Sequence, residues 1–307
     1  MRVRLRGEPQ IDWAMVDAAF TDPFFEQTAE RAMQHPFNLA FRRTTPLAAL
    51  DPFADDPPLA PTGFVFHMSR CGSTLIAQML ARLDATIVLS EPQPLDALLR
   101  LRGRGIDDET LIEWLRRMIS ALGRPRAGER RLFVKFHAWH VLELPLLARA
   151  FPNVPWVFVF REPRAVLRSQ ARGPGAEVIF GTIDPRLMDI DAAAGYALTP
   201  GEYAARVVAA FCDSALRCAA LGRSAFLDYA SLPDGLFDPL LAFFGLSPVE
   251  EETRRMREIA RADTKHAGAA FSARGVTRDP AGEIDRLAAE LLDPSYEALV
   301  RRAAGER

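Results

Sequence analysis

An alternation of short apolar runs with a helical pattern between residues 63 and 90 constrains the fold of this chain more than any other feature. The run "GFVFHM" predicts a buried strand, "STLIAQMLARL" has apolar residues at the three- and four-residue spacing of a helix, and "TIVLS" predicts a second strand. Two strands joined through a helix lie parallel in one sheet. The segment therefore predicts a βαβ unit and a fold of the α/β class.

The same alternation continues along the chain. We expect helices over Asp108–Leu122, from about Val141 to Phe151, from Pro163, and over Gly201–Leu221, with strands at "RLFVKFH", "PWVFVF" and "SAFLDYA" between them. A chain of 307 residues, 49% of them hydrophobic, is long enough to bury a large core. The pattern predicts a three-layer αβα architecture with a mainly parallel sheet.

Two segments depart from this alternation. Residues 1–60 contain the helical patterns "DWAMVDAAF" and "FFEQTAERAMQ" and a connection rich in Pro and Asp, which predicts an N-terminal extension packed on a core domain of residues 61–307. The polar segment 171–200, punctuated by Gly and Pro, interrupts the α/β domain. Long insertions beside such sheets commonly serve function, so we expect a lid over the substrate here.

Composition excludes several classes of partner and compartment. The 38 Lys and Arg nearly cancel the 40 Asp and Glu, so we expect neither nucleic acid nor a membrane as a partner. Three cysteines form neither a disulfide framework nor a zinc-ligand spacing, and the first residues lack the apolar stretch of a signal peptide. These features predict a cytoplasmic protein, and we expect no metal ion because no carboxylate or Cys/His cluster is evident.

The stretch "SRCGSTL" follows the first predicted strand and opens the first predicted helix. Backbone N–H groups and the positive end of a helix dipole would face an anion there. Compared with the nucleotide-binding pattern GxxxxGK[ST], His67 stands at the first glycine and Ser73 at the lysine. A kinase or ATPase would therefore lack its main phosphate-clamping residue. A helix capped by Ser or Thr without any ligand is the alternative interpretation.

These residues resemble the 5′-phosphosulfate loop of the sulfotransferases that use 3′-phosphoadenosine 5′-phosphosulfate. That loop has a basic residue, a small residue, Gly and two hydroxyls, which here are Arg70, Cys71, Gly72, Ser73 and Thr74. Arg70 stands where the family usually has Lys, which keeps the charge but replaces a compact ammonium by a broader fork. The resemblance implies the P-loop nucleoside triphosphate hydrolase-like fold of these enzymes.

A second motif of that family is present further along the chain. The stretch "FVFREPRAVLRSQ" resembles its 3′-phosphate motif, in which an Arg ends a strand and a Ser follows eight residues later; Arg161 and Ser169 have this spacing. Lys265, in "DTKHAGAAFS", lies where the family places a loop over the nucleotide, and would contact a phosphate. The resemblance implies phosphoadenosine phosphosulfate as co-substrate, adenosine 3′,5′-bisphosphate as product, and no metal.

Two residues compete for the role of catalytic base. Glu91, after the second predicted strand, resembles the base of tyrosylprotein sulfotransferases, and partial burial is expected to raise its pKa. Lys135 and His137 resemble the Lys-x-His of cytosolic sulfotransferases, in which the His is the base. The assignment stays open between Glu91 and His137. Arg70 and Lys135 would stabilise charge on the leaving phosphate.

The expected activity is transfer of a sulfuryl group to a hydroxyl or amine of a small-molecule or peptide acceptor. One rival is a small-molecule kinase with a degenerate phosphate loop. Another is a non-catalytic nucleotide-binding protein of the same fold. Neither the acceptor nor the oligomeric state follows from the sequence, because acceptor choice depends on variable loops.

Overall fold

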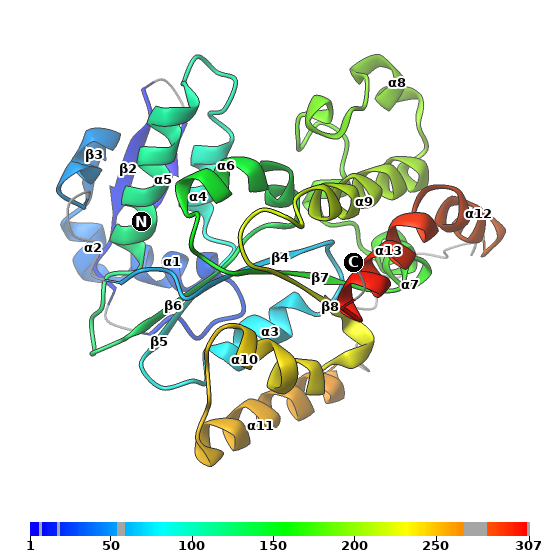
Figure 1. The fold of residues 1–307 in the computed structure, drawn as a ribbon. Coiled ribbons are helices and arrows are strands. Elements are labelled where there is room, and N and C mark those ends of the chain that lie inside the picture. The colour runs from blue at the N-terminus through cyan, green and yellow to red at the C-terminus, as the bar shows by residue number, and fades with distance from the viewer. Residues whose placement is uncertain (6–7, 17–18, 54–58, 267–280, 306–307) are drawn as a thin grey trace.

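The computed structural model describes residues 1–5, 8–16, 19–53, 59–266 and 281–305, apart from the side chains of residues 263–266 and 281. Its centre is a five-stranded, wholly parallel sheet in the order β5-β6-β4-β7-β8 (Figure 1). The strands are β4 (Gly63–His67), β5 (Thr86–Ser90), β6 (Arg131–Lys135), β7 (Trp156–Phe160) and β8 (Ser224–Asp228). The predicted parallel sheet is confirmed.

Helices cover both faces of this sheet (Figure 1). One face carries α3 (Ser73–Leu80), α10 (Leu241–Phe243) and α11 (Glu250–His266). The other carries α4 (Gln93–Leu99), α5 (Asp108–Leu122), α6 (Leu144–Ala150) and α9 (Pro200–Arg217). Beside β8 and α9 lie α7 (Pro163–Arg172), α12 (Ala281–Leu291) and α13 (Asp293–Ala303). The three-layer αβα architecture is confirmed.

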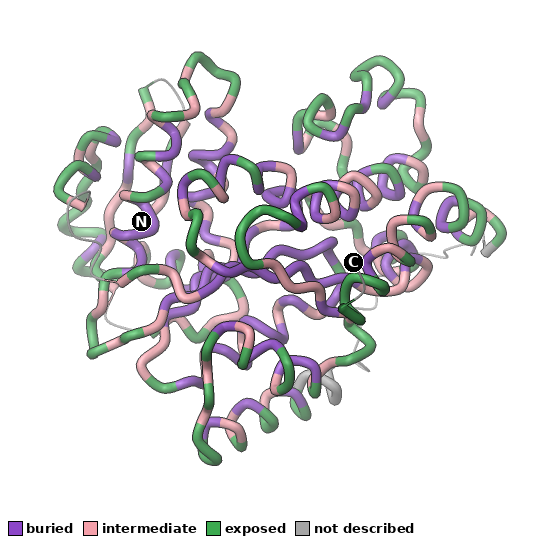
Figure 2. Tube along the Cα trace, viewed as in Figure 1, coloured by how far each residue is buried: buried purple, intermediate pink, exposed green. Residues whose placement is uncertain are grey.

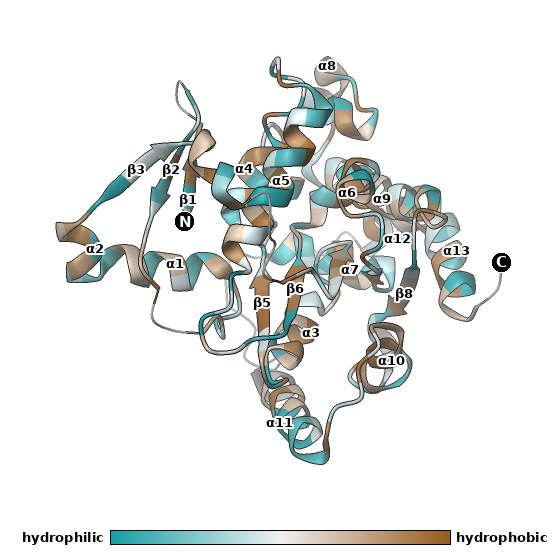
Figure 3. Ribbon diagram, turned by 60° about the vertical axis from the view of Figure 1, so that its left-hand side comes forward, coloured by the Kyte–Doolittle hydropathy of each residue, from teal (hydrophilic) through white to brown (hydrophobic). Residues whose placement is uncertain are grey.

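The strands form where the sequence is apolar without interruption. Every residue of β4 and β7 is buried, as expected for parallel strands with helices on both faces. Phe66 and Phe136 stack with ring centroids 4.8 Å apart, and Phe64 meets Phe136 edge-on at 5.1 Å. Figure 2 shows the sheet as the buried centre, and Figure 3 shows β5 in the colour of hydrophobic residues, whereas α11 is largely hydrophilic. This core fixes the strand ends that carry the candidate site.

The N-terminal residues form a small antiparallel sheet, β1 (Arg2–Arg4), β2 (Gln10–Trp13) and β3 (Arg43–Pro46), with α1 (Phe25–Gln34), α2 (Pro36–Ala40) and the 3-10 turn η1 (Leu47–Phe53). The helical interpretation of "DWAMVDAAF" is wrong where its first residues extend β2. Such a short apolar pattern does not separate helix from strand. The Gln93 side chain of α4 bonds both backbone groups of Val3, at 3.0 Å each.

Segment 171–200 leads from the end of α7 to the first residue of α9, and its helical part α8 (Ala192–Ala197) lies on the side of α9 that faces away from the sheet (Figure 1). The segment also contains the short turns η3 (Ala176–Val178) and η4 (Pro185–Met188), and much of it is exposed (Figure 2). Thr199 and Glu202 form a capping box that starts α9. Of the helices in the described parts of the chain, none combines the length and apolar character needed to cross a membrane.

Candidate active site at the carboxyl edge of the sheet

The carboxyl ends of the parallel strands bring the predicted site residues to one edge. Glu91 directly follows β5, Lys135 ends β6, and the loop of Ser69 and Arg70 follows β4. Arg161 directly follows β7. A cavity of about 460 Å³ opens at this edge and is lined by Arg70 to Thr74, Glu91, Lys135 and His137 among others. Open α/β sheets bind ligands in such crevices.

The loop between β4 and α3 has an unusual backbone conformation. Ser69, Arg70 and Gly72 have positive φ values of 72°, 52° and 79°, and α3 begins at the next residue, Ser73. Consecutive turns of this kind direct backbone N–H groups into a concavity in front of the helix. A left-handed conformation is energetically costly for residues other than Gly, and such residues cluster at functional sites. The conformation of this loop therefore indicates a functional site.

Cys71 is the packing residue of this loop. Its side chain is fully buried, its thiol donates to the Val159 carbonyl oxygen at 3.1 Å, and burial raises its pKa to about 12. The thiol is therefore protonated and unreactive at neutral pH.

Arg161, after β7, and Tyr229, after β8, pack against the loop that follows β4. The guanidinium of Arg161 lies 4.2 Å from the centroid of the Tyr229 ring and donates to the Arg70 carbonyl oxygen at 3.3 Å. A Cβ atom at Gly72 would lie 2.7 Å from the same ring. The structure thus places Arg161 beside the loop, and its expected role at a 3′-phosphate stays a prediction. Tyr229 was not predicted, although its position directly after β8 could have indicated it.

Ser169 and Lys265 are less informative. Ser169 lies in the second turn of α7 and is half-buried, and within the described parts of the chain its hydroxyl makes no hydrogen bond. Lys265 falls in the last turn of α11, and its side chain lies outside the described part of the structure.

Glu91 is the centre of a charged cluster. The ammonium of Lys135 donates to its carboxylate, His137 Nδ1 lies 3.3 Å from Oε2, and His67 Nε2 lies 3.4 Å from Oε1. Glu91 has a φ of 54°, and its N–H donates to the Lys135 carbonyl oxygen at 2.7 Å. The two candidate bases therefore contact each other.

The electrostatics of Glu91 differ from the sequence expectation. Burial by itself would raise the pKa of Glu91, but Lys135 and hydrogen bonds from His137 and His67 outweigh burial and hold that pKa well below its usual value. The expectation of a raised pKa is wrong because the neighbours of the carboxylate come from β4 and β6, distant in sequence. Glu91 is ionised at neutral pH.

His67 connects the loop to this cluster. Its Nδ1 accepts from the Ser69 N–H at 3.1 Å, so Nε2 carries the proton and donates to the Phe136 carbonyl oxygen at 3.0 Å. Burial and the nearby Lys135 lower the pKa of His67, which keeps the ring neutral. The residue that replaces the first glycine of the nucleotide-binding pattern therefore supports both the loop and Glu91.

Other residues of the cavity were not predicted from the sequence. Asp96 accepts from Trp139 Nε1 at 2.8 Å and from Arg100 Nε at 2.7 Å, and Arg100 also donates to the Thr182 carbonyl oxygen at 2.7 Å. These contacts attach α4 to segment 171–200 at the wall of the cavity. The signal available in the sequence was the four-residue spacing of Asp96 and Arg100.

Glu177 and Phe24 complete the wall. Glu177 accepts from the Ser69 hydroxyl and from Gln170 Nε2 at 3.3 Å, so a second carboxylate lies beside the loop after β4. The Lys135 ammonium lies 5.2 Å from the Phe24 ring, which the N-terminal segment supplies. Across residues 1–5, 8–16, 19–53, 59–266 and 281–305, no group of three or more His, Cys, Asp or Glu side chains is arranged to hold a metal ion.

Comparisons with known proteins agree with this fold. No protein-family model and no curated protein sequence matches the chain. Among solved structures it is similar to the sulfotransferase STF9 from Mycobacterium avium, with a TM-score of 0.51 and 15% identity over 86% of this chain and 82% of that one. The chain therefore has the αβα fold of a bacterial sulfotransferase.

Two further structures match less well. A sulfotransferase from Alicyclobacillus acidocaldarius has a TM-score of 0.41 and 15% identity, covering 68% of this chain and 95% of that one. The sulfotransferase domain from the curacin biosynthetic pathway has a TM-score of 0.43 and 16% identity, covering 76% and 98%.

Proposed function

We propose that this protein is a sulfotransferase that moves a sulfuryl group from 3′-phosphoadenosine 5′-phosphosulfate to a hydroxyl or amine of a small-molecule or peptide acceptor. The observation that carries the proposal is the strand order. Strands β4 and β7 are neighbours, and neighbouring strands lie about 4.8 Å apart, so the loop after β4 lies beside Arg161 after β7. The Glu91 cluster lies on the opposite side of the loop, after β5 and β6. A nucleotide that carries anions at both its 5′ and 3′ positions needs two such neighbouring sites.

Each part of the edge then has a role in the reaction. The backbone N–H groups before α3, with Arg70, Ser73 and Thr74, hold the 5′-phosphosulfate. Arg161 holds the 3′-phosphate, with Ser169 and Lys265 as further contacts. The acceptor oxygen or nitrogen attacks the sulfur, the bond from sulfur to the bridging oxygen breaks, and adenosine 3′,5′-bisphosphate leaves.

Lys135 is positioned to stabilise the leaving phosphate. Its ammonium pairs with Glu91 and lies 3.5 Å from Thr74 Oγ1, between the carboxylate and the anion loop. Charge that develops on the bridging oxygen during sulfuryl transfer would be met by this buried cation and by Arg70. The loop, the cation and the carboxylate thus form one connected set.

For the proton, we place the accepting atom on His137. Glu91 is held ionised by Lys135 and is a weak base for that reason, whereas its carboxylate can accept the Nδ1 proton of His137 at 3.3 Å. Nε2 of His137 is then the atom that takes the acceptor's proton, and Glu91 orients the ring. The His137 side chain is 33% exposed and lines the cavity, where an acceptor can reach it.

Calorimetric titration tests the proposed donor. We expect adenosine 3′,5′-bisphosphate to bind wild-type protein and Arg168→Ala alike, and Arg161→Ala to lose at least about tenfold in affinity. Arg168 is the matched control because it lies on α7, the helix that begins two residues after Arg161, and is exposed with a loose 3.7 Å ion pair to Asp285. Preferred binding of ATP with magnesium would support the kinase interpretation instead, and binding of neither nucleotide would contradict both.

A further inference from the structure

A second cavity, larger than the candidate active site, lies where segment 171–200 meets α7, α9 and α12. Its volume is about 880 Å³, within the size range of sites for small molecules. The wall is mostly apolar and includes Val178, Ile179, Phe180, Leu198, Ile284 and Leu287. Ile179 and Tyr196 leave 50% and 80% of their surface exposed here. An apolar surface of this extent favours an apolar ligand.

One residue of the cavity wall carries a buried polar group without a hydrogen-bond partner among the described residues. Tyr203, in the first turn of α9, lines the cavity and is only 2% exposed, yet its hydroxyl makes no hydrogen bond within the described residues. A buried hydroxyl left unpaired costs about 1–3 kcal/mol. A ligand oxygen at this position would supply the missing hydrogen bond.

The rim of the cavity is net positive. Arg172, at the end of α7, is exposed and has no ion pair or hydrogen bond from its side chain in the part of the chain that the structure describes. Arg168 is held only by its 3.7 Å contact with Asp285, and Glu283 is the single acidic residue of the lining. This charge favours a ligand with an anionic group.

We propose that this cavity binds a single-chain amphiphile with an anionic head group, such as an alkyl carboxylate. Its apolar chain covers the wall formed by Val178, Phe180 and Leu287, the anionic head pairs with Arg172, and an oxygen of the ligand accepts the hydroxyl proton of Tyr203. This site is separate from the proposed active site and does not depend on sulfuryl transfer.

The two cavities share one wall. Gly175, Ala176 and Glu177 face the candidate active site, whereas Val178 to Phe180 face the apolar cavity. A ligand in the apolar cavity therefore contacts the same stretch of backbone that borders the anion loop.

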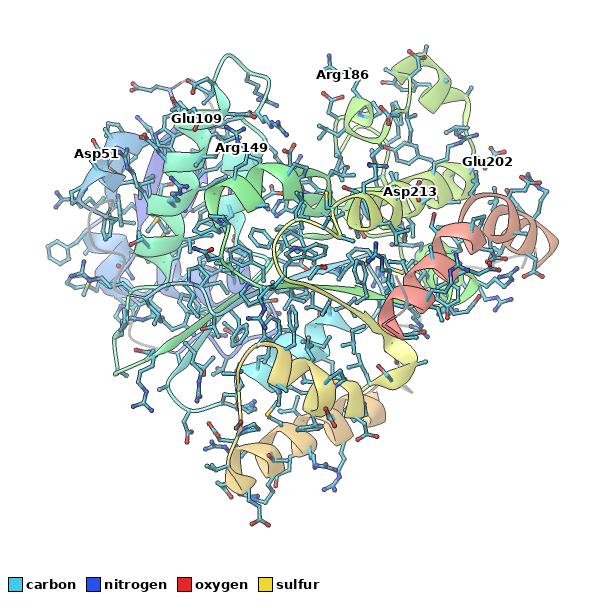
Figure 4. All side chains as sticks on the ribbon, in the orientation of Figure 1. Asp51, Glu109, Arg149, Arg186, Glu202 and Asp213 are labelled. Atoms are coloured by element: carbon cyan, nitrogen blue, oxygen red, sulfur yellow. The ribbon has the colours of Figure 1, made fainter. Side chains whose placement is uncertain are left out.

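The test is calorimetric titration of the full chain with dodecanoate below its micelle concentration, with dodecyltrimethylammonium as the probe of opposite charge. We expect one dodecanoate per chain, weakened about tenfold by Arg172→Gln and several-fold by Tyr203→Phe, which removes only the hydroxyl. Arg186→Gln is the matched control: Arg186 pairs with Asp184 outside the cavity and points away from α9 (Figure 4). Ala204→Trp, which fills the cavity, is expected to abolish binding.

Two results would overturn the proposal. One is the lack of saturable dodecanoate binding by a wild-type protein that unfolds cooperatively. The other is equal binding of the cationic probe with no effect of Arg172→Gln.

Discussion

Glu91 and Lys135 form an ion pair at the carboxyl ends of neighbouring strands, β5 and β6, and the parallel register creates it. Ser90 pairs with Lys135 in the sheet, so the next residue, Glu91, bends back over the lysine. Lys135 is 1% exposed, which makes the carboxylate its essential counter-charge. The pair belongs at once to the core of the protein and to the proposed active site.

Lys135→Met is expected to destabilise the protein at pH 7 by about 3 kcal/mol, because it removes the lysine counter-charge of a largely buried carboxylate that then keeps only its contacts with His137 and His67. In the wild type the pKa of Glu91 is depressed, so its contribution to stability is present above the unfolded pKa of about 4.3 and is lost as the pH falls through the folded pKa. Without Lys135, burial raises that pKa and protonation relieves the cost. The difference in free energy of unfolding between wild type and variant, measured with urea, should therefore become smaller from pH 7 to pH 4.

The double variant Lys135→Met/Glu91→Gln is the control for this prediction. It removes both charges and should recover part of the stability at pH 7. The prediction would be contradicted if Lys135→Met lost the same stability at every pH and the double variant recovered none of it. That result would show that Lys135 contributes to stability through packing alone.

His137→Ala and Glu91→Gln should each lower turnover by about 10²–10⁴-fold once an acceptor is found. Because the proposal has Glu91 act through His137, which lies 3.3 Å away, the double variant should be little slower than His137→Ala. His35→Ala, at an exposed histidine between α1 and α2, is the control and should be fully active. Near-normal turnover of both single variants would exclude both residues as the base.

Gly72→Ala should lower stability and nucleotide affinity more than Gly103→Ala does. Both glycines have a left-handed backbone, with φ of 79° and 74°, so each substitution costs about 1–2 kcal/mol of backbone strain. A Cβ at Gly72 would also lie 2.7 Å from the Tyr229 ring, whereas nothing lies within 4 Å at Gly103. Thermal unfolding of the two variants, and of Gly72→Ala in a Tyr229→Ala background, separates the backbone strain from the clash with the ring. Equal losses of stability in Gly72→Ala and Gly103→Ala would mean that the Tyr229 ring does not lie against Gly72.

The sequence predicted the α/β layers because apolar runs and helical periodicity are local signals, and the helix Asp108–Leu122 was predicted with the bounds that the structure has. It also predicted that Arg70, Glu91 and His137 would lie at the edge, since each follows or precedes a predicted strand end. The contact of His67 with Glu91, the ring of Tyr229 over the loop and the depressed pKa of Glu91 depend on strand order, which no single segment encodes.

The N-terminal sheet was missed for a related reason. Strands β1 and β2 are short and pair with each other, and β2 also pairs with β3, whose residues lie 30 or more positions further along the chain, so their sequences carry weak local patterns. Phe24, which this segment places near Lys135, was missed with it. A side chain that such a segment brings to a site is distant in sequence from the residues that it contacts, so no local motif indicates the contact.

Glu177→Gln should tighten binding of adenosine 3′,5′-bisphosphate about three- to tenfold. The Glu177 carboxylate accepts from the Ser69 hydroxyl and lines the same cavity as the anion loop, so it repels the 5′-phosphate, while Gln keeps the hydrogen-bond acceptor. The gain, measured by calorimetry, should shrink as salt is raised, and Asp184→Asn, at an exposed carboxylate of the same segment, should show none. Unchanged or weaker binding by Glu177→Gln would mean that the 5′ end of the nucleotide does not lie beside this carboxylate, and that Glu177 serves only to hold Ser69 and Gln170 in place.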